Sequence, residues 1–188
     1  MSEKDFINKY LEDFSTLIKP NDDIVTKIIS VRDVMVSAQK SKNKIMIFGN
    51  GGSAAIASHV SVDLTKNAGV RSISFNESDL ITCFANDFGY EHWVSKAIEY
   101  YGDSGDVAVL ISSSGQSPNM VNAAHCARDR GITVLTLSGF ATDNPLRAVG
   151  HRNLWVNSTS YNIVETVHQS WLLACVDYII AGIDRSEE

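Results

Sequence analysis

Five short apolar runs, each followed by a stretch of helical character, constrain the fold of this chain more than any other feature. The runs read KIMIF at 44–48, RSISF at 71–75, VAVLIS at 107–112, ITVLTL at 132–137 and NLWV at 153–156. The helical stretches lie near 53–66, 78–100, 118–130, 143–149 and 161–182. Strands that alternate with helices pair in parallel, and helices then cover both faces of their sheet. We therefore predict an α/β fold, a three-layer α/β/α sandwich around a five-stranded, mainly parallel sheet.

The residues before the first run carry apolar side chains at helical spacing. Residues 3–18 and 22–41 are separated by the break KPNDD, and the second stretch carries Ile24, Ile28, Val31 and Met35. These features predict an N-terminal helical hairpin. Because no linker or internal repeat interrupts the chain, we predict one domain over 1–188. It consists of helices over 1–42, used in oligomer packing, and an α/β core over 43–188.

Composition argues against several classes of protein. The 188 residues carry a net charge of −6 and a pI near 5.3, whereas nucleic-acid binding needs clustered Lys and Arg. No apolar run approaches the roughly 18 residues that span a bilayer, and the first residues lack the apolar region of a signal peptide. We expect a cytoplasmic protein with neither nucleic acid nor a membrane as partner. Cys83, Cys126 and Cys175 are scattered and odd in number, which predicts buried thiols without disulfides.

Two loops follow strand ends, where ligands bind in open parallel sheets. One is Gly49-Asn50-Gly51-Gly52-Ser53, and the other is ISSSGQSPN at 111–119. In the second loop, Pro118 fits the first helical position and Ser117 the N-cap. The serine hydroxyls and the helix N–H groups together predict a phosphate site that needs no lysine. The alternatives are a polar capped turn or a dinucleotide fingerprint, Gly49-x-Gly51-x-x-Ala54, although the fingerprint leaves the serine loop unexplained.

The two loops at this spacing resemble the sugar isomerase (SIS) domain family, and more narrowly its phosphoheptose isomerases. The resemblance is carried by GNGGSAAIASH at 49–59, CFANDFGYE at 83–91, ISSSGQSPN at 111–119, GITVLTLSG at 131–139 and IVETVH at 163–168. It implies a homotetramer with active sites at subunit interfaces. It also implies interconversion of sedoheptulose 7-phosphate and D-glycero-D-manno-heptose 7-phosphate for lipopolysaccharide or surface-polysaccharide synthesis.

The resemblance further implies which residues bind the substrate. The phosphate is expected at Ser112, Ser113, Ser114 and Ser117, the sugar at Asn50, Gly51, Gly52 and Ser53, and the sugar hydroxyls at Asn86 and Asp87.

The catalytic positions depart from the family pattern. Phosphoheptose isomerases use a Glu on the helix after the glycine loop as base and a His on the last helix as its partner. Here the Glu position is Asp63 and the His position is Leu173, which cannot transfer a proton. Some members bind zinc through these two positions, a His that corresponds to His59 and a Gln that corresponds to Glu165.

His168 is the candidate replacement for the missing histidine, since it lies three residues after Glu165. We therefore predict Asp63, Glu165 and His168 as catalytic residues. We also hypothesise that one Zn²⁺ ion is held by His59, Asp63, Glu165 and His168. His92, His125 and His151 lie outside the matching stretches and are predicted to be structural.

A second class of function stays open. The chain is alternatively a non-catalytic SIS protein that binds a phosphosugar, or an adaptor like the phosphoheptose-isomerase-like factor that binds the replication initiator DnaA. Leu173 favours this alternative, whereas imidazoles and carboxylates on two helices favour catalysis. A metal ion bound by them would disfavour the adaptor.

Overall fold

The computed structural model describes residues 1–183 and contains a five-stranded sheet in the order β2-β1-β3-β4-β5. All neighbouring strands are parallel, so the predicted sheet is confirmed and is wholly rather than mainly parallel. The strands are β1 (Ile45–Gly49), β2 (Ser72–Ser74), β3 (Val107–Ser112), β4 (Thr133–Ser138) and β5 (Arg152–Trp155). The chain leaves β1 toward one edge for β2 and returns across β1 for β3. The strand order therefore reverses between β1 and β3.

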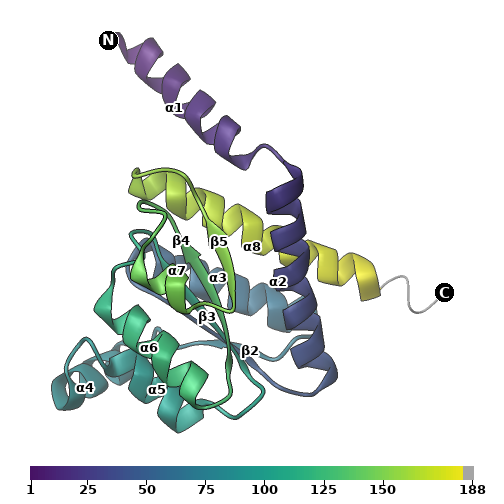
Figure 1. Cartoon of the computed structure of the whole chain (residues 1–188), viewed down its shortest axis with the longest axis vertical. Helices are drawn as coiled ribbons and strands as arrows, with labels where there is room; N and C mark the ends of the chain where they lie inside the picture. Colours follow the sequence, from purple (N-terminus) through teal and green to yellow (C-terminus); the bar gives the residue numbers. More distant parts are fainter. Residues whose placement is uncertain (184–188) are drawn as a thin grey trace.

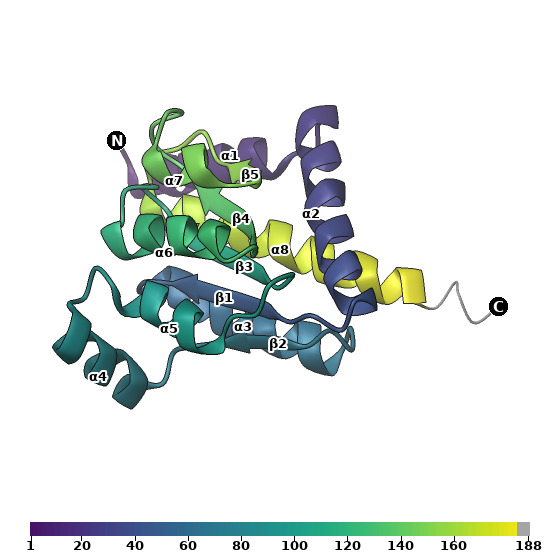
Figure 2. The same cartoon turned by 60° about the horizontal axis from the view of Figure 1, so that its bottom comes forward.

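Helices cover both faces of this sheet and confirm the three-layer arrangement (Figure 1). Along β1, Ile47 belongs to a buried cluster with α3 and α8, whereas Phe48 belongs to one with α5 and α6. This alternation follows from the two-residue period of a strand. In Figure 2, α5 and α6 lie in front of the sheet and α3 and α8 behind it. The core helices are α3 (Gly52–Lys66), α4 (Ser78–Phe88), α5 (Trp93–Tyr101), α6 (Pro118–Asp129), α7 (Pro145–Val149) and α8 (Tyr161–Ile183).

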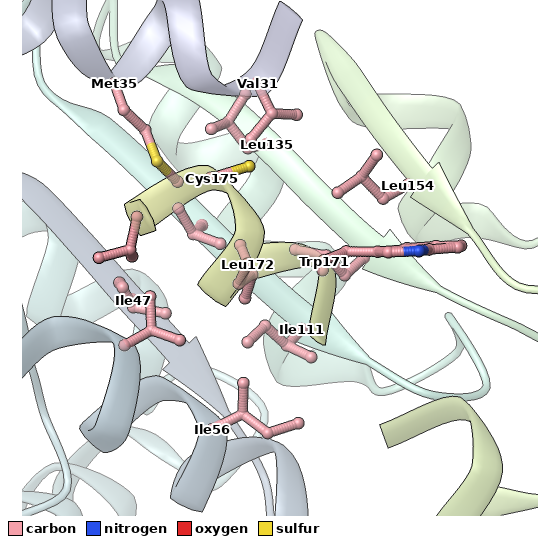
Figure 3. Packing of buried hydrophobic residues seen from close by; sticks show 14 of the residues in the cluster. Val31, Met35, Ile47, Ile56, Ile111, Leu135, Leu154, Trp171, Leu172 and Cys175 are labelled. Carbon is pink, nitrogen blue, oxygen red and sulfur yellow. The ribbon is translucent and has the colours of Figure 1, made fainter. Parts of the chain in front are cut away.

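The last helix, α8, is anchored to the sheet by large apolar side chains. Trp171, Leu172 and Cys175 are buried in the same cluster as Ile47 and Ile111 (Figure 3). Complete burial of side chains of this size contributes about 1.5–3 kcal/mol each. The strongly apolar sequence of α8 is thus largely explained within one chain, and this packing fixes which face of α8 meets α3.

One predicted helix is divided into two. The stretch 78–100 forms α4 and α5, because Gly89 ends α4 with a φ of 86°. Residues with a side chain rarely adopt that conformation, so the chain turns there. α4 contains no buried residue. Cys83 lies on α4 and is exposed, so the prediction of a buried thiol is wrong for Cys83; Cys126 is half-buried and Cys175 is buried as predicted.

The N-terminal helices α1 (Glu3–Ile18) and α2 (Asp22–Lys40) form as predicted, but they do not pack as a hairpin. α2 packs against α8, whereas α1 touches α8 and then projects from the body of the molecule (Figure 1). α1 contains no buried residue, and its Phe6, Ile7 and Leu11 are exposed. A single chain thus leaves these three apolar side chains of α1 uncovered. Over residues 1–183, no helix combines the length and apolarity that a membrane crossing requires.

Candidate functional site

The glycine loop and the serine loop meet where the strand order reverses. Gly49, the last residue of β1, pairs with Ile111 near the end of β3, so the two strands finish side by side. α3 begins at Gly52 and α6 at Pro118, each directly after its loop. Two helix N-termini therefore lie at one edge of the sheet, where their N–H groups and dipoles favour an anion.

Between the two loops lies a small cavity of about 110 Å³, here called the loop pocket. It contains all four serines predicted for phosphate, together with Asn50 and Ser53 from the predicted sugar site. Ser53, Ser112 and Ser113 are buried. The full lining is Asn50, Ser53, Ile111, Ser112, Ser113, Ser114, Ser117, Tyr161 and Glu165.

The serine loop leaves hydrogen-bond donors open toward this pocket. Ser117 lies at the N-cap position as predicted, but its hydroxyl pairs with that of Ser112 at 3.0 Å and does not cap α6. The Ser114 hydroxyl accepts from the Gln116 N–H at 3.2 Å. The Ser113 hydroxyl is buried and has no partner in the described part of the chain. Because Ser113 also lines the loop pocket, its hydroxyl is available to donate to a ligand bound there.

Asn144, at the start of α7, holds the serine loop from behind. Its side chain accepts from the Arg147 N–H at 2.9 Å and donates to the Ser138 hydroxyl at 3.1 Å. It lies so close to Gly115 that a side chain at position 115 would overlap it. The N–H of Leu146 also donates to the Gly115 carbonyl at 3.0 Å. The loop is therefore fixed before a ligand arrives, which reduces the entropy cost of binding.

The Asn50 side chain is held by two residues that the sequence did not identify. Asn50 and the buried Asn119 exchange amide hydrogen bonds of 3.1 and 2.9 Å. The Tyr90 hydroxyl donates to the Asn50 carbonyl oxygen at 3.1 Å. Both residues lie within the stretches that resemble the family. That resemblance is the sequence signal by which they could have been identified.

Glu165 of α8 brings a carboxyl group into the loop pocket. It lies against Gly52 in the first turn of α3, where any side chain at position 52 would overlap its carboxyl oxygens. Burial raises the pKa of Glu165, and the nearby Ser113 hydroxyl opposes that rise without meeting hydrogen-bonding geometry. A carboxyl group with a raised pKa beside an anion site is a candidate for proton transfer.

One turn further along α8, a second polar region lies where α8 packs on α3; we call it the helix groove. The His59 Nε2 lies 3.2 Å from Asp63 Oδ2, and the His59 Nδ1 lies 2.9 Å from Gln169 Nε2. The Asn67 amide donates to the other Asp63 oxygen at 3.1 Å. The His59 and Asp63 side chains are 47% and 25% exposed, so water reaches the groove. Gln169 was not predicted.

His168, predicted as a catalytic residue and zinc ligand because it lies three residues after Glu165, faces neither region. It is fully buried, and its Nε2 lies 3.1 Å from the Ser138 carbonyl oxygen. Burial lowers the pKa of His168 to about 4. Residues three apart on a helix differ by about 60° in direction, which is enough to turn His168 into the core. Leu173 packs against the core as well.

Within a single chain, the four predicted zinc ligands do not lie close to one another. Glu165 lies in the loop pocket, His168 in the core, and His59 with Asp63 in the helix groove. Among residues 1–183, no three His, Cys, Asp or Glu side chains are placed to hold one ion. The four-residue metal site is therefore corrected: these positions do not form it.

The remaining predicted residues lie outside the loop pocket. Asn86 and Asp87 are exposed at the end of α4, where the Asn86 amide donates to Asp87 at 2.9 Å. His92 and His125 are exposed, and the His151 Nδ1 accepts from the Val134 N–H at 2.9 Å.

A larger hollow of about 520 Å³ lies between β2, α4 and α5. Its charged side chains are the acidic Glu77 and Asp79, and no residue of the glycine loop or the serine loop lines it. The loop pocket is therefore the stronger candidate for an anion site. The hollow is otherwise mostly apolar, with Ile73, Phe75, Leu80, Cys83, Phe84 and Tyr101.

Comparisons with known proteins agree with this architecture. Residues 9–139 match the family described as SIS domain. A phosphoheptose isomerase of Bradyrhizobium sp. is 36% identical over 111 residues, 56% of either chain. That of Sulfurimonas denitrificans is 33% identical over 142 residues, 72% of either chain. The structure of phosphoheptose isomerase GmhA from Neisseria gonorrhoeae matches 95% of this chain and 99% of its own, with a TM-score of 0.87 and 24% identity, a likeness of fold.

Proposed function

The chain belongs to the SIS domain family, and on that premise we propose that it is a sugar-phosphate isomerase. We propose sedoheptulose 7-phosphate as its substrate and D-glycero-D-manno-heptose 7-phosphate as its product, because its relatives are named phosphoheptose isomerases. The observation that carries the proposal is the loop pocket. It combines an unpartnered buried hydroxyl, at Ser113, with a carboxyl group of raised pKa, at Glu165.

The serine loop is the proposed phosphate site. The hydroxyls of Ser112, Ser113, Ser114 and Ser117 and the N-terminus of α6 would donate to the phosphate oxygens. The site is uncharged apart from Glu165, so binding rests on hydrogen bonds and on the helix dipole. Each hydrogen bond to a charged group contributes about 1.5–3 kcal/mol.

Glu165 is the proposed base. In the proposed direction, isomerisation breaks a C–H bond at C1 of the ketose and forms one at C2, and one carboxylate can carry this proton between the two carbons of the enediol. A second proton passes from the C1 hydroxyl to the C2 carbonyl oxygen. Donors to the carbonyl oxygen would come from the Ser53 and Tyr161 side chains, which line the same pocket. Asp63, the sequence counterpart of the family's base, is proposed instead to orient His59, because its carboxylate is engaged by His59 and Asn67.

A homotetramer is the proposed form of the enzyme. The loop pocket of one chain, about 110 Å³, is smaller than the roughly 300 Å³ of small ligand sites. A pocket of this size holds only part of the sugar phosphate, so a neighbouring subunit would enclose the rest. The uncovered Phe6, Ile7 and Leu11 of α1 offer an apolar face for such contact.

The test is isotope exchange. The protein is incubated with sedoheptulose 7-phosphate in D₂O, and deuterium at C1 and C2 is followed by NMR. Exchange at both carbons supports the isomerase. Binding of the sugar phosphate without exchange at either carbon would instead support the non-catalytic alternative.

A further inference from the structure

We propose that Gln169 locks His59 into a hydrogen-bonded relay with Asp63, and that this relay takes the place of a metal centre in the helix groove. The relay belongs to the resting protein and needs no turnover of any sugar. Its central contact is the 2.9 Å approach of Gln169 Nε2 to His59 Nδ1, and Gln169 is a residue that the sequence did not predict for the site.

The relay has a fixed direction. An amide NH₂ group can only donate, so His59 Nδ1 accepts from Gln169. The hydrogen of the neutral ring then lies on Nε2, which donates to Asp63 Oδ2 at 3.2 Å. The second Asp63 oxygen accepts from Asn67 at 3.1 Å. Donors and acceptors thus match along the whole series, and one tautomer of His59 is selected.

A metal ion would find few ligands here. A neutral imidazole binds a metal through its free lone pair, and in His59 that lone pair is occupied by Gln169. Breaking this bond would give an ion two side chains, His59 and Asp63, whereas zinc takes three or four protein ligands. Leu173 has no atom that binds a metal, and its side chain packs against the core. Glu165 lies against Gly52 in the loop pocket and not in the groove. The groove therefore favours its own hydrogen bonds over an ion.

The first test reads the His59 tautomer directly. Proton–nitrogen NMR of the imidazole rings at neutral pH is recorded for the wild type and for Gln169→Met, with the exposed His92 and His125 as internal controls. The wild type is expected to show the Nε2–H form of His59, and Gln169→Met is expected to show a mixture. A mixture in the wild type, or a single tautomer that survives Gln169→Met, would overturn the inference.

The second test uses zinc itself. Equilibrium dialysis of the full chain against zinc sulfate is expected to give the same affinity for the wild type and for His59→Ala. Gln169→His would add a third ligand beside His59 and Asp63, and is expected to tighten zinc binding by about tenfold or more. Weaker zinc binding in His59→Ala than in the wild type, or no gain in Gln169→His, would contradict the relay.

Discussion

The loop pocket and the helix groove are neighbours on α8, one turn apart, and they differ in what they leave unpaired. In the loop pocket, the Ser113 hydroxyl has no partner in the described part of the chain, and α6 has no side-chain cap. In the helix groove, both ring nitrogens of His59 and both oxygens of Asp63 are engaged by side chains. Open donors indicate a place for a ligand, whereas a closed hydrogen-bond series is complete without one.

The comparison also separates two carboxyl groups. Burial raises the pKa of Glu165 in the pocket, whereas Asp63 in the groove is partly exposed and hydrogen-bonded. The sequence places the family's base at Asp63, yet the structure places Glu165 beside the open donors. A base must lie within reach of the proton that it removes, and this favours Glu165.

The largest effect is expected from Gly52→Ala, which should lower isotope exchange by disturbing the loop pocket and not the helix groove. The added methyl group overlaps the Glu165 carboxyl group. Because that group ends a flexible side chain, it moves aside at little cost in stability. A displacement of about 1 Å can lower a catalytic rate 100-fold, so isotope exchange should fall by about that factor. Gly182→Ala is the matched control, since a methyl group there meets open space. Unchanged exchange in Gly52→Ala would remove Glu165 from the mechanism.

The next largest effect is expected on stability, as His168 on the buried side of α8 becomes protonated at low pH. The pKa of His168 in the folded state is about 4, from an ordinary value of 6.5. The unfolded chain therefore binds more protons below pH 6.5, and the free energy of unfolding should fall by roughly 3 kcal/mol as pH drops from 6.5 to 4. Above about pH 7.5, where His168 is neutral in both states, it contributes no pH dependence. Chemical denaturation over this range measures the slope.

The control for that slope is His168→Gln, which keeps an N–H donor for the Ser138 carbonyl oxygen but cannot titrate. This variant should have a lower free energy of unfolding at neutral pH than the wild type. Between pH 6.5 and 4, its free energy of unfolding should change less with pH. An equally steep curve in His168→Gln would place the titration elsewhere.

Ser113→Ala should act on binding alone. Because the Ser113 hydroxyl has no partner among residues 1–183, its removal should leave stability unchanged, whereas a bound phosphate loses one donor worth about 1.5 kcal/mol or more. Calorimetry with sedoheptulose 7-phosphate should show affinity reduced by about tenfold. Ser72→Ala is the matched control, since the Ser72 hydroxyl is equally buried and unpartnered but lies on β2. Equal affinities of the two variants would exclude Ser113 from the phosphate site.

The smallest effect is expected from Asn67→Ala in the helix groove. It removes one exposed hydrogen bond to Asp63, which contributes about 0.5–1 kcal/mol at most. Denaturation should show a change of this size, and isotope exchange should match the wild type. A strong loss of exchange would move the chemistry from the pocket to the groove.

The sequence predicted the centre of the sheet well because the central strands are buried on both faces. β1 and β3 are buried throughout, so apolar runs alone mark them. The serine loop was located for a similar reason, since ligand loops follow the carboxyl ends of parallel strands. The break at Gly89 was missed because the residues on both sides of it are helical.

The site was predicted less completely, because side-chain direction depends on packing. Glu165 and Gln169 face α3, whereas His168 between them points to Ser138. A rotation of about 100° per residue separates such neighbours, and only the packing of α8 decides which of them faces inward. The contact of His59 with Gln169 joins residues 110 positions apart, so no local pattern reveals it.

The most direct test compares isotope exchange into sedoheptulose 7-phosphate in Glu165→Gln and Asp63→Asn. Both changes replace a carboxylate with an amide of the same shape, and calorimetry of the sugar phosphate checks that the pocket still binds. If Glu165 is the base, Glu165→Gln should lose exchange by a factor of about 10²–10⁴ while it still binds, and Asp63→Asn should stay close to the wild type. Retained exchange in Glu165→Gln, together with its loss in Asp63→Asn, would contradict the account and place the chemistry in the helix groove.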